Sequence, residues 1–212
     1  MSIKQAYFDK AGEGAVKAFR SRGFDAHYCK SAIEAKSMAL SLISPEDTIA
    51  WGGSVTIDTL GLKEALYSRG NKMLDREKAQ TAEERTEIMR QGLLCDTFLM
   101  SANALSADGQ MVNIDGMGNR VAALCYGPKN VVVIAGMNKL CPTVDDAIVR
   151  ARNTVAPMNS QRFPSETRPC YLTGKCSDCK APDTICNQIV ITRYSRTPGR
   201  IKLILVGEEL GM

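Results

Sequence analysis

The sequence predicts an α/β fold: a parallel or mixed sheet with helices on both faces, and a cysteine-rich segment near the C-terminus. Three observations support it. Short β-prone runs alternate with segments of helical periodicity along most of the chain. Residues 130–136, NVVVIAG, are continuously apolar, as strands buried on both faces of a parallel or mixed sheet are. Four of the eight cysteines lie within residues 169–187.

The N-terminal part of the chain predicts two helices around a strand. Helical spacing of apolar residues covers 3–22, and a short strand is expected over 24–29. Ser31 and Glu34 have the spacing of a capping box, which marks the start of a second helix. Pro45 ends that helix, because proline cannot continue it.

The next segment repeats the alternation. TIAW, residues 48–51, is a short apolar strand, and the helical period resumes over 58–70. A charged helix begins at Thr81, again with a capping-box glutamate at Glu84. Apolar residues then return over 96–103, so strand and helix succeed one another as in a βα-type sheet.

The second half predicts a hairpin and three further strands. Asp108-Gly109, between two β-prone runs, is a hairpin signal. A helix is expected over 143–154, with two aspartates in its first turn, where the helix dipole favours negative charge. The remaining strands are expected over 130–136, 187–194 and 200–208.

Composition narrows the class of protein. With 212 residues, 44% of them hydrophobic and 24% charged, the chain is expected to form one globular domain over 1–212, with the cysteine-rich segment, 165–190, inside it. No apolar run has the length of a signal peptide or a membrane span, so we expect a cytoplasmic protein. The net charge of +4, without basic and aromatic interleaving, argues against nucleic-acid binding.

The stretch WGGSVT, around residues 51–56, is a candidate anion-binding turn. Two glycines let the backbone turn sharply, and the hydroxyls of Ser54 and Thr56 add donors near a helix start. It lacks both the lysine of a Walker loop and the three-glycine dinucleotide fingerprint. A plain strand-to-helix connection with a serine cap explains the same residues, so both interpretations stay open.

A polar stretch over residues 101–120 is the second candidate. Its Asn and Asp residues serve either as turn formers or as the lining of a pocket in which Asp115 and Arg120 meet a polar ligand. Lys139, just after the strand 130–136, could add a cation at a strand's carboxyl end. His27, the only histidine, is interpreted as structural, and Cys29, Cys95, Cys125 and Cys141 as small buried residues.

The cysteine segment has the donor set of a metal site. Cys170, Cys176, Cys179 and Cys186 are spaced C-x5-C-x2-C-x6-C, and four thiolates complete the shell of zinc or of an iron–sulfur cluster. A reducing cytosol disfavours a disulfide, while unligated thiols stay an alternative. The segment between residues 161 and 202 contains eight basic and three acidic residues, and this positive balance suits an anionic four-thiolate centre.

Long blocks of the chain resemble the LUD domain, the lactate-utilization family that includes lactate utilization protein C. The blocks are GGSVTIDTLG, SANALSADGQMVNIDGMGNRVAALCYGPKNVVVIAGMNKL, RARNTVAPMNSQRF, PCYLTGKCSDCKAPDTICN and IKLILVGEELG. The resemblance implies a Rossmann-like α/β fold, a parallel or mixed sheet shared with sugar-phosphate isomerases, CoA transferases and 5-formyltetrahydrofolate cyclo-ligase. It also implies that the glycine turn faces a ligand site. No glutamate matches a CoA-transferase motif, which argues against a covalent CoA thioester.

The resemblance also implies a set of site residues and a cofactor. Family members with the four-cysteine tail resemble iron–sulfur proteins, which favours a 4Fe-4S cluster over zinc at the four cysteines. The glycine turn and the polar stretch would line one cleft. The candidate ligand-binding residues are Gly52, Gly53, Ser54, Val55, Thr56, Asn103, Asp108, Asp115, Asn119, Arg120 and Lys139.

Two functions follow as hypotheses. The leading one is an iron–sulfur protein of the lactate-utilization type, acting on a small hydroxy acid or related anionic metabolite together with redox partner subunits. The alternative is a non-redox enzyme or binding protein with a structural zinc, in which Asp108 or Asp115 acts as acid or base. A subunit without activity of its own, or a homo-oligomer, is compatible with either.

Overall fold

The computed structural model describes residues 2–212, and a parallel sheet of six strands forms its centre. The strands, in spatial order, are β1 (Asp25–Cys29), β10 (Ile201–Val206), β7 (Asn130–Gly136), β4 (Thr97–Met100), β2 (Thr48–Trp51) and β3 (Lys72–Met73). Every pair in this sheet is parallel. The α/β prediction, a parallel sheet flanked by helices, is therefore confirmed.

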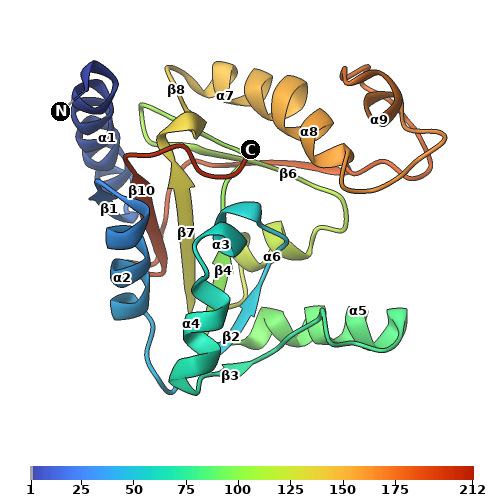
Figure 1. The fold of residues 1–212 in the computed structure, drawn as a ribbon, viewed down its shortest axis with the longest axis horizontal. Coiled ribbons are helices and arrows are strands. Elements are labelled where there is room, and N and C mark those ends of the chain that lie inside the picture. The colour runs from blue at the N-terminus through green and yellow to red at the C-terminus, as the bar shows by residue number, and fades with distance from the viewer. Residues whose placement is uncertain (1) are drawn as a thin grey trace.

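Helices connect most of the strands (Figure 1). They are α1 (Ile3–Ser21), α2 (Ala32–Leu42), α3 (Val55–Thr59), α4 (Leu62–Arg69), α5 (Ala82–Gln91), α6 (Asn119–Cys125), α7 (Val144–Arg150), α8 (Ala156–Ser160) and α9 (Pro169–Thr173). Two short 3-10 turns, η1 (Gly92–Leu94) and η2 (Met137–Lys139), and a π-helical turn, η3 (Ala151–Val155), complete the set. Ser31 and Thr81 cap α2 and α5 as predicted.

Both faces of the central sheet are buried, which explains the continuous apolar strands. In β7, Val131 and Val133 belong to the core beneath α1 and α6, whereas Val132 and Ile134 belong to the core beneath α2, α3 and α4. Successive strand residues point to opposite faces, so a strand covered on both sides must be apolar at every position.

A smaller second sheet lies beyond the end at which β7 finishes (Figure 1). It contains β8 (Leu140–Cys141), β5 (Ala104–Ser106), β6 (Met111–Asp115) and β9 (Gln188–Thr192), in that order. β5 and β6 form the predicted hairpin, with Ala104 opposite Val112. The positive φ of Gly109, 92°, suits the turn, where a β-carbon would come 2.7 Å from the backbone of Ala18.

Three predicted elements differ in the structure. The helix expected over 58–70 is divided at Gly61, whose left-handed backbone separates α3 from α4. The helix expected over 143–154 continues through η3 and α8 to Ser160, and the π-helical turn η3 lies just before Pro157, where it interrupts the regular hydrogen bonding that a proline cannot join. Strand 187–194 pairs with β6 in the second sheet and not in the central one.

A helix that crosses a membrane must be both long and apolar. Within residues 2–212, no helix combines the length and the apolar character needed to cross a bilayer.

Candidate functional site

A cleft of about 410 Å³ opens where β2, β4 and β7 end. The central sheet supplies the segments that follow these strands: Gly53–Thr56 after β2, Ser101–Asn103 after β4 and Lys139 after β7. The second sheet and α8 close the opposite side with Asp115 and Asn159. Carboxyl ends of adjacent parallel strands are the usual ligand position in open α/β sheets.

Nine of the eleven predicted ligand-binding residues line this cleft. They are Gly53, Ser54, Val55, Thr56, Asn103, Asp115, Asn119, Arg120 and Lys139. The glycine turn and the polar stretch, nearly fifty residues apart in the sequence, therefore come together, although whether they bind a ligand stays a prediction.

Gly52 and Asp108 do not line the cleft. Gly52 lies beneath Arg120, and its N–H donates to the carbonyl of Leu99, which extends the sheet. Asp108 lies in the β5–β6 turn, where its carboxylate accepts from Arg22 of α1 at 2.8 Å. The expectation that Asp108 shares the cleft is wrong, because the hairpin carries its turn towards α1 and only its far end, at Asp115, towards the cleft.

The glycine turn caps helix α3 and also forms part of the cleft wall. The Ser54 hydroxyl accepts from the N–H of Ile57 at 3.3 Å, which caps α3. Thr56, almost fully buried, donates to the carbonyl of Leu210 at 3.4 Å. Ser54 and Thr56 thus have structural roles and also line the cleft. Both interpretations of WGGSVT, a capped strand-to-helix connection and an anion-binding turn, therefore remain compatible with the structure.

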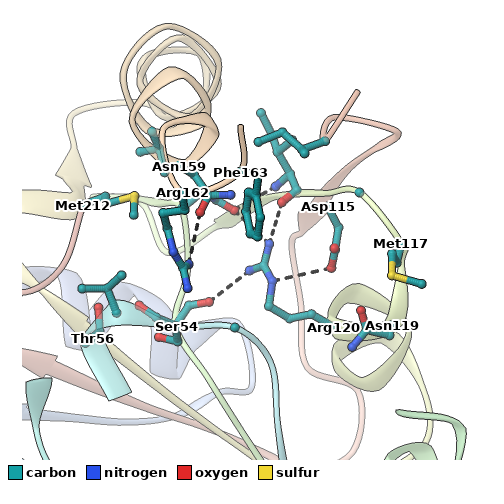
Figure 2. Close-up of a pocket in the computed structure, with 18 of the residues that line it drawn as sticks. Ser54, Thr56, Asp115, Met117, Asn119, Arg120, Asn159, Arg162, Phe163 and Met212 are labelled. Carbon is teal, nitrogen blue, oxygen red and sulfur yellow. Dashed lines mark hydrogen bonds and ion pairs between the residues drawn. The ribbon is translucent and has the colours of Figure 1, made fainter. Parts of the chain in front are cut away.

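Arg120 is fixed at the centre of the cleft wall (Figure 2). Its Nη1 donates to Asn113 Oδ1 at 2.6 Å and to the Ser101 carbonyl at 3.1 Å. Its Nη2 donates to the Ile114 carbonyl and to Asn103, and Asp115 lies 3.5 Å from its Nε. With so many acceptors already engaged, the guanidinium chiefly ties the β6 end and the segment after β4 together.

Lys139 is a buried cation without a carboxylate partner. Its ammonium donates to Ser101 Oγ at 2.9 Å and to Thr56 Oγ1 at 3.0 Å, both neutral hydroxyls. Burial, and then the charges of Arg150 and Arg120, lower the pKa of Lys139 to about 7. Within residues 2–212 no acidic side chain pairs with it, so an anion in the cleft would supply the missing counter-charge.

Three arginines that the sequence did not single out also line the cleft: Arg76, Arg85 and Arg162. Figure 2 shows Arg162 extending from the end of α8 towards Ser54. Arg162 belongs to the block RARNTVAPMNSQRF, so the resemblance contained a signal for it. Arg76 and Arg85 lie in a charged loop and an ordinary charged helix, where nothing in the pattern distinguishes them from solvated residues.

The four clustered cysteines share a second, smaller cavity of about 70 Å³. Cys170 is buried and Cys176, Cys179 and Cys186 are partly buried. Burial, and then the charges of the other three cysteines, raise the pKa of Cys186 to about 11. Within residues 2–212, however, no three Cys, His, Asp or Glu side chains already form a group that could hold a metal ion. The four thiols therefore line the same cavity without lying close enough together to ligate one ion as they stand.

Arg168 gives this cavity an unusual feature. Its side chain is almost fully buried, its Nη2 donates to the Phe163 carbonyl at 2.8 Å, and the same nitrogen lies 3.4 Å from Asp183 Oδ2. Its Nε and Nη1 are buried with no hydrogen-bond partner. Unpaired buried donors cost free energy, and donors beside thiolates stabilise the negative charge of a four-thiolate centre. The donor set and Arg168 therefore fit an anionic cluster.

The remaining cysteines and His27 lie outside both cavities. Cys29, Cys95 and Cys141 are buried, as expected, whereas Cys125 is exposed and corrects that expectation. Cys125 is the last residue of α6, beyond the apolar face that Ala123 and Leu124 present to the core. The Nε2 atom of His27 lies 2.8 Å from Oδ1 of Asp25 on the same strand.

Comparisons with known proteins agree with the resemblance. The family model of the LUD domain matches residues 12–206, so the chain belongs to the LUD domain family. No curated protein matches the sequence. Among solved structures, a DUF162 family protein from Deinococcus radiodurans is similar over 97% of this chain and 99% of its own, with a TM-score of 0.51 and 13% identity. Ribose 5 phosphate isomerase A from Neisseria gonorrhoeae is similar over 53% of each chain, with a TM-score of 0.34 and 17% identity.

Proposed function

We propose that this LUD domain protein binds a small hydroxy acid or related anionic metabolite in the cleft and a 4Fe-4S cluster at its four clustered cysteines. Its role would lie in the redox metabolism of that metabolite, together with partner subunits that exchange electrons with it. One observation carries the proposal: Ile114 borders both the cleft and the cysteine cavity. Ile114 would therefore form part of the wall between a ligand and a redox centre in these places.

The cleft supplies binding and orientation. Lys139 offers a buried ammonium to a carboxylate, and the hydroxyls of Ser101 and Thr56 lie within hydrogen-bond distance of the same nitrogen. A metabolite carboxylate would complete this arrangement and favour the charged form of Lys139. The cleft volume, about 410 Å³, suits a small metabolite.

The cysteine cavity supplies the ligands of the cluster. Cys170, Cys176, Cys179 and Cys186 would hold it, and Arg168 would direct its unpaired N–H groups towards the sulfur atoms. A bound 4Fe-4S cluster would supply one-electron transfer. The positive charge of the buried Arg168 favours ionised thiols, whereas the raised pKa of Cys186 opposes ionisation, so a bound cluster would have to displace the proton of Cys186.

Anaerobic purification followed by iron and acid-labile sulfide analysis tests the cluster. We expect about four of each per chain, with broad visible absorption. Cys176→Ser should lose the cluster, whereas Cys125→Ser, which changes an exposed cysteine outside the cavity, should retain it. A colourless protein loaded with zinc under these conditions would contradict the iron–sulfur proposal.

Thermal-shift titration with lactate and other 2-hydroxy acids tests the cleft. Stabilisation should rise with ligand concentration by mass action. Lys139→Met should abolish the shift, whereas Lys10→Met, an exposed lysine on α1, should preserve it. Equal shifts in the two variants would remove Lys139 from the binding site.

A further inference from the structure

Three arginines gather on one side of the cleft without a counter-charge. Arg76 lies in the loop between β3 and α5, Arg85 on α5, and Arg162 just after α8. Burial, then the charge of Arg85 and, more weakly, that of Arg162 lower the pKa of Arg76, while the carboxylates of Glu77 and Asp115 act in the opposite direction. Like charges brought together from three segments repel one another, and such an arrangement is stabilised when an anion lies among them.

The contacts of these arginines leave their charges available. Arg76 Nη1 meets only Met89 Sδ, at 3.6 Å, and its Nε is buried without a hydrogen-bond partner. Arg85 donates to the carbonyl of Arg76 at 3.4 Å. Arg162 donates to Asn159 Oδ1 at 3.3 Å (Figure 2). These acceptors are neutral, so none of them compensates a guanidinium charge.

The acidic residues that line the cleft contact other cations or a backbone N–H group, and not the three arginines. Asp58 and Glu77 both pair with Lys63, at 2.8 and 3.2 Å. Asp115 lies beside Arg120 and accepts from the N–H of Val121. Across residues 2–212, no carboxylate lies within ion-pair distance of the three guanidinium groups, so Glu77 and Asp115 offset the charge of the arginine cluster only from farther away.

Arg76, of the arginine cluster, and Lys139 lie at different ends of the glycine turn. A β-carbon at Gly53 would lie 3.2 Å from Arg76 Nη2, which places Arg76 against the beginning of the turn. Lys139 contacts Thr56, three residues later. The cleft thus has two cationic positions, one at each end of the same short segment.

We infer that the cleft takes a metabolite with two anionic groups: a carboxylate at Lys139, Thr56 and Ser101, and a second carboxylate or a phosphate at Arg76, Arg85 and Arg162. This inference rests on the proposed function, because it adds a second subsite to the same cleft. Guanidinium groups bind carboxylate and phosphate oxygens in paired hydrogen bonds, so three of them form a strong subsite for either group.

Isothermal titration with lactate, malate and 3-phosphoglycerate tests the second subsite, because all three share a 2-hydroxy carboxylate head. We expect malate or 3-phosphoglycerate to bind at least about tenfold more tightly than lactate. Arg76→Gln and Arg85→Gln should reduce that affinity to the level of lactate and leave lactate binding unchanged. Arg90→Gln, an exposed arginine on the same helix as Arg85, should change nothing.

The outcomes separate the two proposals. A preference for malate over 3-phosphoglycerate assigns a carboxylate to the arginine cluster, and the reverse preference assigns a phosphate. Equal affinity for all three ligands, or an equal loss for all three in Arg76→Gln, would overturn the second subsite while the proposed function stands. Failure of every ligand to bind the folded protein would overturn both proposals.

Discussion

Arg120 lies directly over Gly52: a β-carbon at position 52 would stand 2.8 Å from Arg120 Cδ. The side chain of Arg120 cannot retreat easily, because its guanidinium donates to acceptors on both the segment after β4 and the end of β6. Gly52 is therefore required for the close approach of a side chain and not for an unusual backbone angle. The glycine turn and the polar stretch are coupled through this one contact.

Gly52→Ala should destabilise the protein by about 1–3 kcal/mol, because the added methyl group forces Arg120 out of its hydrogen bonds. Urea unfolding measures the effect. Gly14→Ala is the matched control, since Gly14 is exposed on α1, a β-carbon there would meet nothing within 4 Å, and alanine is the better helix former. A Gly52→Ala protein as stable as wild type would show that Arg120 moves freely.

Lys139 should make stability depend on pH. Because burial lowers the pKa of Lys139 from 10.5 to about 7, the folded chain binds fewer protons than the unfolded chain between these values. The free energy of unfolding should therefore rise with pH across this window. Lys139→Met should flatten the rise, as measured by urea unfolding at about pH 7 and about pH 9. An unchanged pH profile in the variant would contradict the assignment.

Ligand binding should be coupled to protonation of the same group. An anion beside Lys139 raises the pKa of Lys139, so binding at about pH 8 should take up a proton, approaching one per ligand. Titration calorimetry in buffers of different ionisation enthalpy measures this uptake. Wild-type protein that binds the ligand without proton uptake would place the anion away from Lys139.

Asp108→Asn should leave ligand affinity unchanged, because Asp108 belongs to the hairpin turn outside the cleft. Hydrogen bonds from Ser106 and Gln110, and the charge of Arg22, lower the pKa of Asp108. Its contribution to stability is therefore present above about pH 4 and is lost as the pH falls through the lowered pKa. Thermal unfolding should show a small destabilisation of the variant near neutral pH that disappears in acid. Weaker ligand binding by Asp108→Asn than by the wild-type protein would show that Asp108 contributes to the binding site.

Sequence patterns predicted the central sheet well because its strands are buried on both faces. The runs 48–51 and 130–136 coincide with β2 and β7, and the hairpin at Asp108-Gly109 is present. Periodicity could not reveal that β9 joins a second sheet, since its alternating burial is compatible with either sheet edge.

The site was predictable where residues follow strand ends. Ser54, Asn103 and Lys139 come after β2, β4 and β7, and the parallel order brings these ends together. Arg76 and Arg85 reach the cleft only through the path of the chain around α5, which no local pattern encodes. Asp108 and Asp115 look alike in the sequence, and only the direction of the hairpin separates them.

The position of β10 has a consequence for biosynthesis. β10 lies between β1 and β7, and β1, an edge strand, pairs with β10 alone, so that Asp25 is opposite Lys202. β1 therefore has no partner strand until β10 has been made, and contacts so distant along the chain form slowly. The cysteine segment emerges before β10, while the central sheet is still open. Under the proposed function, iron and sulfide delivered to the nascent chain would reach these cysteines before the fold closes around them.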